Sequence, residues 1–285
     1  HKVILDSTLA TPFLNRPLQR KNPAERPDYV IHSYTKDLAG TGAATAGVVI
    51  GKIETMFGPK GHTTGGVFWQ DTMFWDVYYI KGAFLDADKA YEVLTGMKTL
   101  EQRMLHKCVS TRVFTRFLES HSSVNVSSNA IETHPNHDIM SELHYLGLPA
   151  PLFSFDLEKA KLPTSVFKQF FDSLEPTFSH QVSIGQPNTL VLCPALTSHS
   201  ELSRDAMIDA GIFSTTIRVS MGLEDVRELA AHIVTSAKIH IDPVLPGFSD
   251  GFNLDSIDEW LKHETQSTHL KHIESSPTAR QRIEG

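Results

Sequence analysis

Three short apolar runs separated by polar loops occupy the N-terminal part of the chain and constrain its fold more than any other feature. The runs are Val3 to Leu5, Tyr29 to Ile31 and Gly47 to Ile50, and the segments between them contain Pro12, Pro17, Pro23 and Pro27. Short apolar runs bounded by turn residues are typical of buried strands. We therefore predict part of an α/β sheet here. Because a domain rarely begins inside its sheet, we expect the chain to be the C-terminal portion of a longer polypeptide.

Further along the chain, apolar residues recur at the spacing of an α-helix. Asp86 or Asp88 can cap a helix that runs to Leu94, and after Gly96 the apolar positions predict a long connecting helix to about Glu119. Beyond this helix short strands alternate with helices, which indicates a smaller α+β domain. The predicted strands are 153–157, 190–192 and 216–219, and the predicted helices are 165–173 and 223–236.

These patterns divide the chain into three predicted parts. Residues 1–105 form the end of a large α/β domain with a mostly parallel sheet, residues 106–240 form the small domain, and residues 241–285 form a surface extension. Within this extension Asp255 to Leu261 is expected to form one or two helical turns.

An aromatic cluster of Phe68, Trp69, Phe74, Trp75, Tyr78 and Tyr79 is expected in a core or a subunit interface.

Composition excludes several classes of protein. The 285 residues include 26 basic and 33 acidic side chains, a formal charge of −7, and 40% of the residues are hydrophobic. This balance excludes disordered and fibrous chains, and the scattered basic residues argue against a nucleic-acid partner. Two cysteines cannot build a disulfide framework, and no apolar run is long enough to cross a bilayer. We expect a soluble protein of a reducing compartment, the cytoplasm.

Lys36 is the first candidate for chemistry. It follows a predicted strand in the sequence His32-Ser33-Tyr34-Thr35-Lys36. A lysine amine with a lowered pKa condenses with a carbonyl to form a Schiff base, and the two neighbouring hydroxyls can bind a phosphate. Taken alone, this motif is also compatible with an ordinary surface lysine.

Asp6 stands at the end of the first predicted strand, within the sequence Asp6-Ser7-Thr8-Leu9-Ala10-Thr11-Pro12. Open α/β sheets bind ligands at the carboxyl ends of their strands, where a pyridinium nitrogen would need an anionic partner. Alone, Asp6 is equally a cap of a strand-end loop. Paired with the Ser-X-Thr-Lys motif around Lys36, it resembles the Cys/Met-metabolism family of pyridoxal-phosphate enzymes, the transsulfuration group.

Further motifs extend this resemblance through the chain in order. Residues 94–104 resemble the Gly-X-Lys-Thr-Leu segment of the family, and residues 153–155, 182–185 and 193–199 resemble its small-domain motifs. The sequence Ile217-Arg218-Val219-Ser220-Met221-Gly222-Leu223-Glu224-Asp225 is close to the family's Ile-Arg-Leu-Ser-Val-Gly-Leu-Glu-Asp. The resemblance implies an aspartate-aminotransferase-like fold of type I, pyridoxal 5'-phosphate as cofactor, and a homotetramer built from two dimers with shared active sites.

The resemblance also implies roles for individual residues. Lys36 would hold the cofactor as an internal aldimine, Asp6 would pair with the ring nitrogen, and Ser33 and Thr35 would bind phosphate oxygens. Arg218 would grip the α-carboxylate of the amino-acid substrate, because a planar guanidinium matches carboxylate geometry. The remaining predicted substrate-binding residues are Ser183, Ser198 and Val182.

Several positions depart from the family pattern. Ser7 replaces Asn, Ser198 replaces Thr, Cys193 replaces His, and residues 38–43 replace a Gly-Gly-His-Ser-Asp loop. The ring-stacking tyrosine and the phosphate-binding residues that reach a neighbouring subunit have no counterpart in the chain. We therefore expect an N-terminal portion of the same protein to complete the site.

Two further signals favour structural roles. His134 and His137, across a proline, are too nonspecific to predict a metal site, and none is expected. Cys193 follows the apolar sequence Leu190-Val191-Leu192, which indicates a buried small hydrophobic residue rather than a reactive thiol.

The resemblance implies a lyase that eliminates the γ-substituent of cystathionine or methionine and yields a 2-oxo acid, ammonia and a thiol. A γ-replacement transferase, of the cystathionine γ-synthase or O-acetylhomoserine sulfhydrylase type, remains open because this fold supports either outcome. The apolar Val182 stands where cystathionine-acting members often carry Glu, which favours methionine or an O-acylated homoserine. A non-catalytic relative that keeps only the fold is a remote alternative.

Overall fold

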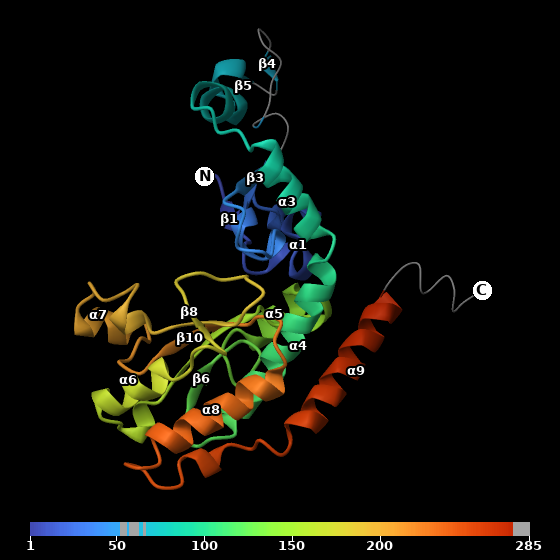
Figure 1. Ribbon diagram of the computed structural model, residues 1–285. Coiled ribbons are helices and arrows are strands. Elements are labelled where there is room, and N and C mark those ends of the chain that lie inside the picture. The colour runs from blue at the N-terminus through green and yellow to red at the C-terminus, as the bar shows by residue number, and fades with distance from the viewer. Residues whose placement is uncertain (52–55, 57–62, 65–66, 276–285) are drawn as a thin grey trace. The chain divides into compact units, whose positions relative to one another are not determined.

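The structure, a computed structural model, describes residues 1–51, 56, 63–64 and 67–275, which fall into two compact units (Figure 1). Unit 1 runs from His1 to Leu100, and unit 2 runs from Glu101 to Gly285. Among the described residues, no helix combines the length and the apolar character that crossing a membrane requires.

The sheet of unit 1 is built from the three apolar runs that the sequence marks. Strands β1 (Ile4–Asp6), β2 (Tyr29–Ser33) and β3 (Gly47–Gly51) lie in the order β1-β2-β3. β1 pairs with β2 in parallel, and β2 pairs with β3 antiparallel. This part of the sheet is therefore mixed, because the chain reverses its direction between β2 and β3.

The burial expected for the first strand is not found. Val3 and Ile4 are 58% and 60% exposed. The reason is that β1 is an edge strand, paired only with β2 in the part of the chain that the structure describes.

Short helices and one longer helix complete unit 1. The short ones are α1 (Thr11–Leu14), η1 (Pro17–Gln19), η2 (Pro23–Glu25), η3 (Tyr34–Leu38), η4 (Trp69–Asp71) and η5 (Phe74–Ile80), and β4 (Thr63–Thr64) pairs with β5 (Val67–Phe68). The long helix α3 (Ala87–Met97) begins at the predicted cap, where the Asp86 carboxylate accepts a hydrogen bond from the Lys89 N–H at 2.9 Å.

The aromatic cluster lies on β5, η4 and η5, and its rings pack mainly on one another. The ring centroids of Trp69 and Trp75 are 4.1 Å apart, and those of Trp75 and Tyr79 are 4.9 Å apart. Phe68 and Tyr79 are each 61% exposed. Among the residues that the structure describes, the cluster is thus not part of a hydrophobic core, and the subunit interface remains the predicted role.

Unit 2 contains a five-stranded sheet in the order β6-β7-β10-β9-β8. Its strands are β6 (Asn125–Ser127), β7 (Leu152–Asp156), β8 (Ser179–His180), β9 (Leu190–Leu192) and β10 (Ile217–Ser220). All neighbouring pairs are antiparallel except β8 and β9. β7, β9 and β10 confirm the strands predicted from the apolar runs.

Long and short helices complete unit 2. They are α4 (Leu100–Glu119), which starts at the end of unit 1, α5 (His137–Leu143), α6 (Thr164–Asp172), α7 (Arg204–Asp209), α8 (Val226–His240) and α9 (Ile257–Ser275), with the short helices η6 (Tyr145–Gly147), η7 (Glu158–Ala160), η8 (Pro194–Leu196) and η9 (Ser249–Gly251). Phe114 of α4, Phe155 of β7, Val219 of β10 and Leu229 of α8 share one hydrophobic cluster. Burying such side chains stabilises each by about 1.5–3 kcal/mol.

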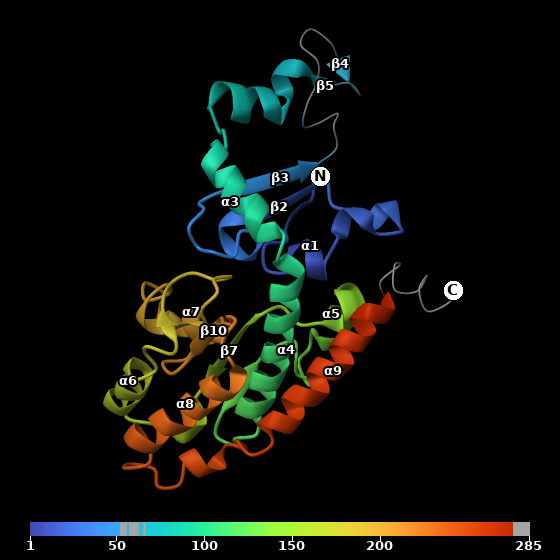
Figure 2. The same cartoon turned by 45° about the vertical axis from the view of Figure 1, so that its right-hand side comes forward.

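The residues after α8 add to this core. Phe248, Phe252 and Ile257 are buried in it, and α9 then runs beside α4 in both views (Figures 1 and 2). The sequence predicted one or two helical turns between Asp255 and Leu261, whereas the helix continues to Ser275. Residues 276–285 of the predicted surface extension lie outside the described residues.

Candidate active site

The carboxyl ends of β1 and β2 lie at one edge of the unit 1 sheet. Asp6 is paired with Ile31 in the parallel register, and the Ser7 N–H donates to the Ile31 carbonyl at 2.9 Å. The Ser33 N–H donates to the Thr8 hydroxyl at 2.8 Å. These contacts bring the Asp6 loop and the start of the Lys36 turn together, as expected for adjacent parallel strands.

Asp6 presents a largely exposed carboxylate at this edge. The Thr8 N–H donates to Asp6 Oδ1 at 2.9 Å. Hydrogen bonds from the Thr8 side chain and backbone hold the pKa of Asp6 below its usual range, and the nearby His32 lowers it further. Asp6 is therefore an anion at neutral pH, which is the state needed to pair with a protonated ring nitrogen.

Lys36 lies half-buried in the tight turn η3, directly after β2. The Gly40 N–H donates to the Lys36 carbonyl at 2.8 Å, and the Tyr34 N–H donates to the Ala46 carbonyl at 2.9 Å. The Thr35 hydroxyl accepts from the Ala46 N–H at 3.0 Å and lies 3.3 Å from the Ala46 carbonyl. Thr35 thus ties the turn to the residues before β3, and its predicted phosphate contact stays a prediction.

Two buried polar atoms next to these residues have unused hydrogen-bonding capacity. Among the described residues, Ser7 Oγ and His32 Nδ1 have no hydrogen-bond partner. Burial lowers the pKa of His32, which keeps the imidazole neutral at pH 7. The anionic Asp6, the lysine amine and the unsatisfied polar atoms fit a site for a polar, phosphorylated pyridine.

A glycine on α3 allows this helix to approach the lysine turn. A Cβ on Gly96 would lie 1.9 Å from the Ala39 carbonyl oxygen, closer than any real contact. Ala39 is in turn packed with Val93 of the same helix. The turn that carries Lys36 is therefore held in place by direct backbone contact with α3.

Arg218 and Ser183 meet in unit 2. Arg218 lies on β10, and its Nη2 donates to the Ser183 carbonyl at 3.1 Å. The neighbouring Ser220 hydroxyl accepts from the Gly185 N–H at 3.2 Å. Burial lowers the pKa of Arg218, but a guanidinium remains charged at neutral pH. A half-buried cation of this kind suits a carboxylate ligand.

Val182 and Ser198 are more exposed than Arg218. Val182 is 67% exposed, and the Ser198 hydroxyl lies 2.8 Å from Nδ1 of His199. No hydrogen bond joins Ser198 to Arg218 within the described ranges. The substrate contacts predicted for Val182 and Ser198 stay predictions.

Sequence reasoning missed residues that support the site. The Thr8 N–H donates to the Asp6 carboxylate, and the Thr8 hydroxyl accepts from the Ser33 N–H. The Glu224 carboxylate accepts from the Thr189 N–H at 2.7 Å and from its hydroxyl at 2.8 Å, and this hydroxyl accepts from the Gly222 N–H at 2.9 Å. The only sequence signal for these roles was the presence of Thr8 and Glu224 inside recognised motifs.

Cys193 is a buried residue, as the sequence indicated. Cys193 is fully buried, and burial raises the pKa of its thiol, which makes it unreactive. His137 uses Nδ1 to contact the Asn129 carbonyl at 2.9 Å.

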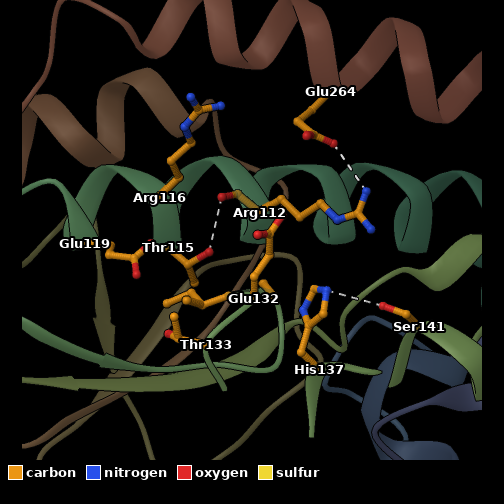
Figure 3. Close-up of a pocket in the computed structure, with 11 residues that line it drawn as sticks. Arg112, Thr115, Arg116, Glu119, Glu132, Thr133, His137, Ser141 and Glu264 are labelled. Carbon is orange, nitrogen blue, oxygen red and sulfur yellow. Dashed lines mark hydrogen bonds and ion pairs between the residues drawn. The ribbon is translucent and has the colours of Figure 1, made fainter. Parts of the chain in front are cut away.

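A cavity of about 610 Å³ lies in unit 2 between α4, α5 and α9 (Figure 3). Arg112 spans it to Glu264, with 3.3 Å between Nη1 and Oε2, and also donates to the Gly147 carbonyl at 2.7 Å. Arg116 stacks on the Trp260 ring at 4.4 Å. These pairs attach α9 to α4 beside the cavity.

Comparison with known proteins decides the family. The sequence profile described as "Cys/Met metabolism PLP-dependent enzyme" matches residues 1–237. The chain belongs to this family. The match confirms the predicted resemblance, the type I fold and pyridoxal phosphate as the cofactor of the family.

Individual relatives agree with this assignment. The chain is 31% identical over 233 residues to L-methionine gamma-lyase of Fusobacterium nucleatum subsp. polymorphum, covering 81% of the chain and 53% of the relative. It is 27% identical over 266 residues to O-acetyl-L-homoserine sulfhydrylase of Leptospira meyeri, covering 83% of the chain and 57% of the relative. The chain therefore spans about half the length of the curated relatives it matches.

A solved structure shows the same fold. Cystathionine gamma-lyase of Micromonospora echinospora superposes with a TM-score of 0.68 at 25% identity, covering 83% of the chain and 56% of the solved chain. The carboxyl-end edge of the unit 1 sheet and the Arg218 region of unit 2 thus lie within the part of this Cys/Met-metabolism chain that matches its relatives.

Proposed function

We propose that the chain is part of a pyridoxal-phosphate enzyme that acts on a sulfur-containing or O-acylated homoserine-type amino acid. Its main reaction would be C–S elimination, in which methionine or cystathionine and water give a 2-oxo acid, ammonia and a thiol. The family assignment and the methionine gamma-lyase relatives support this proposal. We further propose a cytoplasmic homotetramer, whose stoichiometry a native mass measurement tests.

The observation that best supports the proposal is that the Asp6 loop and the start of the Lys36 turn lie together at one edge of the unit 1 sheet. The cofactor supplies an electron sink for a carbanion at the substrate Cα. Asp6 would keep its ring nitrogen protonated, and Ser33 and Thr35 would bind its phosphate. The Lys36 amine would attach it and then move protons at the substrate Cα and Cβ.

Arg218 would bind the substrate α-carboxylate, next to Ser183 and with Ser198 at the periphery. Its half-buried guanidinium, oriented by the Ser183 carbonyl, supports this role. Val182 offers an exposed apolar side chain rather than a carboxylate for a distal amino group. This favours methionine or an O-acylated homoserine over cystathionine.

A γ-replacement transferase is the second candidate, and the O-acetyl-L-homoserine sulfhydrylase relative supports it. The two reactions separate when the protein is incubated with O-acetylhomoserine, with and without sulfide. Release of 2-oxobutanoate at the same rate in both conditions is expected for elimination. Release that disappears in favour of homocysteine when sulfide is added would identify the transferase.

Lys36→Ala is the control for this assay, because it removes the amine without changing the strands. We expect it to abolish turnover of both L-methionine and O-acetylhomoserine. Equal turnover by the variant and the wild type would contradict the proposal, and a cofactor-loaded wild type inactive on all these substrates would point to a non-catalytic relative.

A further inference from the structure

Lys107 is a fully buried lysine whose position the proposed mechanism does not use. It lies on the inner face of α4, with an exposed fraction of 0%. Removing an ammonium group from water is costly unless hydrogen bonds and charges compensate for it. Such a residue on a core-facing helix requires a specific partner.

One partner of Lys107 belongs to the segment beside Arg218. The Lys107 Nζ donates to the Gln186 carbonyl at 2.8 Å, across 79 positions of sequence. Gln186 lies in residues 183–187, which we name the carboxylate turn because Ser183 at its start accepts a hydrogen bond from Arg218.

The carboxylate turn is also anchored to β10 and to the residues that follow it. The Gly185 N–H donates to the Ser220 hydroxyl at 3.2 Å, and the Leu223 N–H donates to the Pro187 carbonyl at 2.6 Å. Lys107 adds an anchor from a different element, α4. A hydrogen bond from a charged donor is roughly twice as strong as a neutral one.

We propose that Lys107 is a positioning residue of the substrate-carboxylate site: its buried ammonium fixes the carboxylate turn and, through the Ser183 carbonyl, the orientation of the Arg218 guanidinium. This inference rests on the proposed function insofar as Arg218 binds substrate. Lys107 touches neither substrate nor cofactor in this account, so its loss changes substrate affinity and leaves attachment of the cofactor to Lys36 intact.

The test compares Lys107→Met, which keeps the length of the side chain and removes its charge and donor, with Lys107→Gln, which keeps a neutral donor. Val113→Ala is the matched control, because it removes buried volume from the same helix without a hydrogen bond to the carboxylate turn. Three quantities are measured in the full chain: hydrogen exchange of the peptide spanning residues 183–187, the half-saturating concentration of L-methionine, and borohydride-trapped cofactor on Lys36.

We expect Lys107→Met to accelerate exchange in the carboxylate turn and to raise the half-saturating L-methionine concentration by about tenfold or more, the effect of losing a charge-assisted hydrogen bond. The Gln variant should show a smaller change, and trapping on Lys36 should stay at the wild-type level. If the Met variant fails to fold, the Gln variant carries the test, with faster exchange than in the wild type as the expected result.

The proposal is overturned if the Lys107 variants change exchange and methionine affinity no more than Val113→Ala does. This outcome differs from failure of the proposed function, in which the wild type itself has no cofactor trapped on Lys36. Exchange in the carboxylate turn can be measured with or without added cofactor, so it tests the anchoring by Lys107 in either case.

Discussion

At the scale of single residues, the position of the Arg218 guanidinium leads to a direct prediction about substrate affinity. Its guanidinium is half-buried and oriented by the Ser183 carbonyl. Arg218→Lys keeps the charge but loses the planar pair of donors. We expect KM for L-methionine to rise by about 10- to 100-fold, because one or two charge-assisted hydrogen bonds are lost. The change in kcat should be smaller. Steady-state kinetics measures both.

Arg204→Lys is the matched control for this substitution, because Arg204 is exposed on α7. It should leave KM unchanged. A fall in kcat with an unchanged KM in Arg218→Lys would show that Arg218 does not bind the substrate in its ground state.

His121 gives a prediction for stability against pH. The Ser123 N–H donates to its Nδ1 at 3.0 Å, so Nε2 carries the hydrogen that faces the Phe248 carbonyl at 2.8 Å. Burial lowers the pKa of His121 from its ordinary value of 6.5. The unfolded chain therefore binds more protons than the folded chain in the range just below pH 6.5.

The stability that neutral His121 contributes is complete above pH 6.5 and is lost as the pH falls below it. We expect the free energy of unfolding in urea to decrease from pH 7.5 to pH 5.5, and His121→Gln to reduce this slope. His32 and His144, whose pKa values burial also lowers, would account for part of the remaining slope. His263→Gln, at an exposed position, is the control. An identical slope in wild type and His121→Gln would contradict the assignment.

At the scale of elements, the contact between α3 and the Lys36 turn is the tightest backbone approach near the site. Gly96→Ala would place a Cβ 1.9 Å from the Ala39 carbonyl oxygen, so the helix or the turn must move. We expect a loss of about 1–3 kcal/mol in the free energy of unfolding, together with weaker cofactor binding. Urea titration and cofactor absorbance measure the two effects.

Gly47→Ala is the matched control on β3. Its Cβ would meet only the His32 carbonyl oxygen at 3.5 Å, an ordinary contact. Equal stability losses in the two variants would show that close packing at Gly96 is not what positions the turn.

Much of the arrangement of elements was predictable from the chain. The cap at Asp86 and the apolar runs of β7, β9 and β10 carry their own local signals. The antiparallel direction of β3 was not predictable, because alternation of apolar residues does not specify strand direction. The full length of α9 was missed because its residues are mostly polar and it is held by distant partners such as Arg112.

In the candidate site too, residues within local motifs were predictable, whereas residues that depend on distant partners were not. Asp6, Lys36 and Arg218 were found because they occur in motifs with characteristic neighbours. Thr8, Glu224 and Lys107 act through partners far away in the sequence, such as Ser33, Thr189 and Gln186. No local pattern specifies such partners, so these roles emerge only from the fold.

At the scale of the whole molecule, the residues proposed for chemistry and those proposed for substrate recognition belong to different units. Asp6 and Lys36 lie in unit 1, whereas Arg218, Ser183 and Lys107 lie in unit 2. We therefore predict that substitutions of these unit 2 residues change substrate affinity while cofactor attachment persists. Cofactor attachment to Lys36 is the central proposal.

The most direct test of this claim is borohydride reduction of the purified protein with pyridoxal phosphate, followed by intact mass measurement and peptide mapping. Borohydride converts a Schiff base into a stable amine, so the attached group survives digestion. We predict a single phosphopyridoxyl adduct on the peptide that contains Lys36, and its absence in Lys36→Ala. An adduct on another lysine, or none at all, would contradict the account.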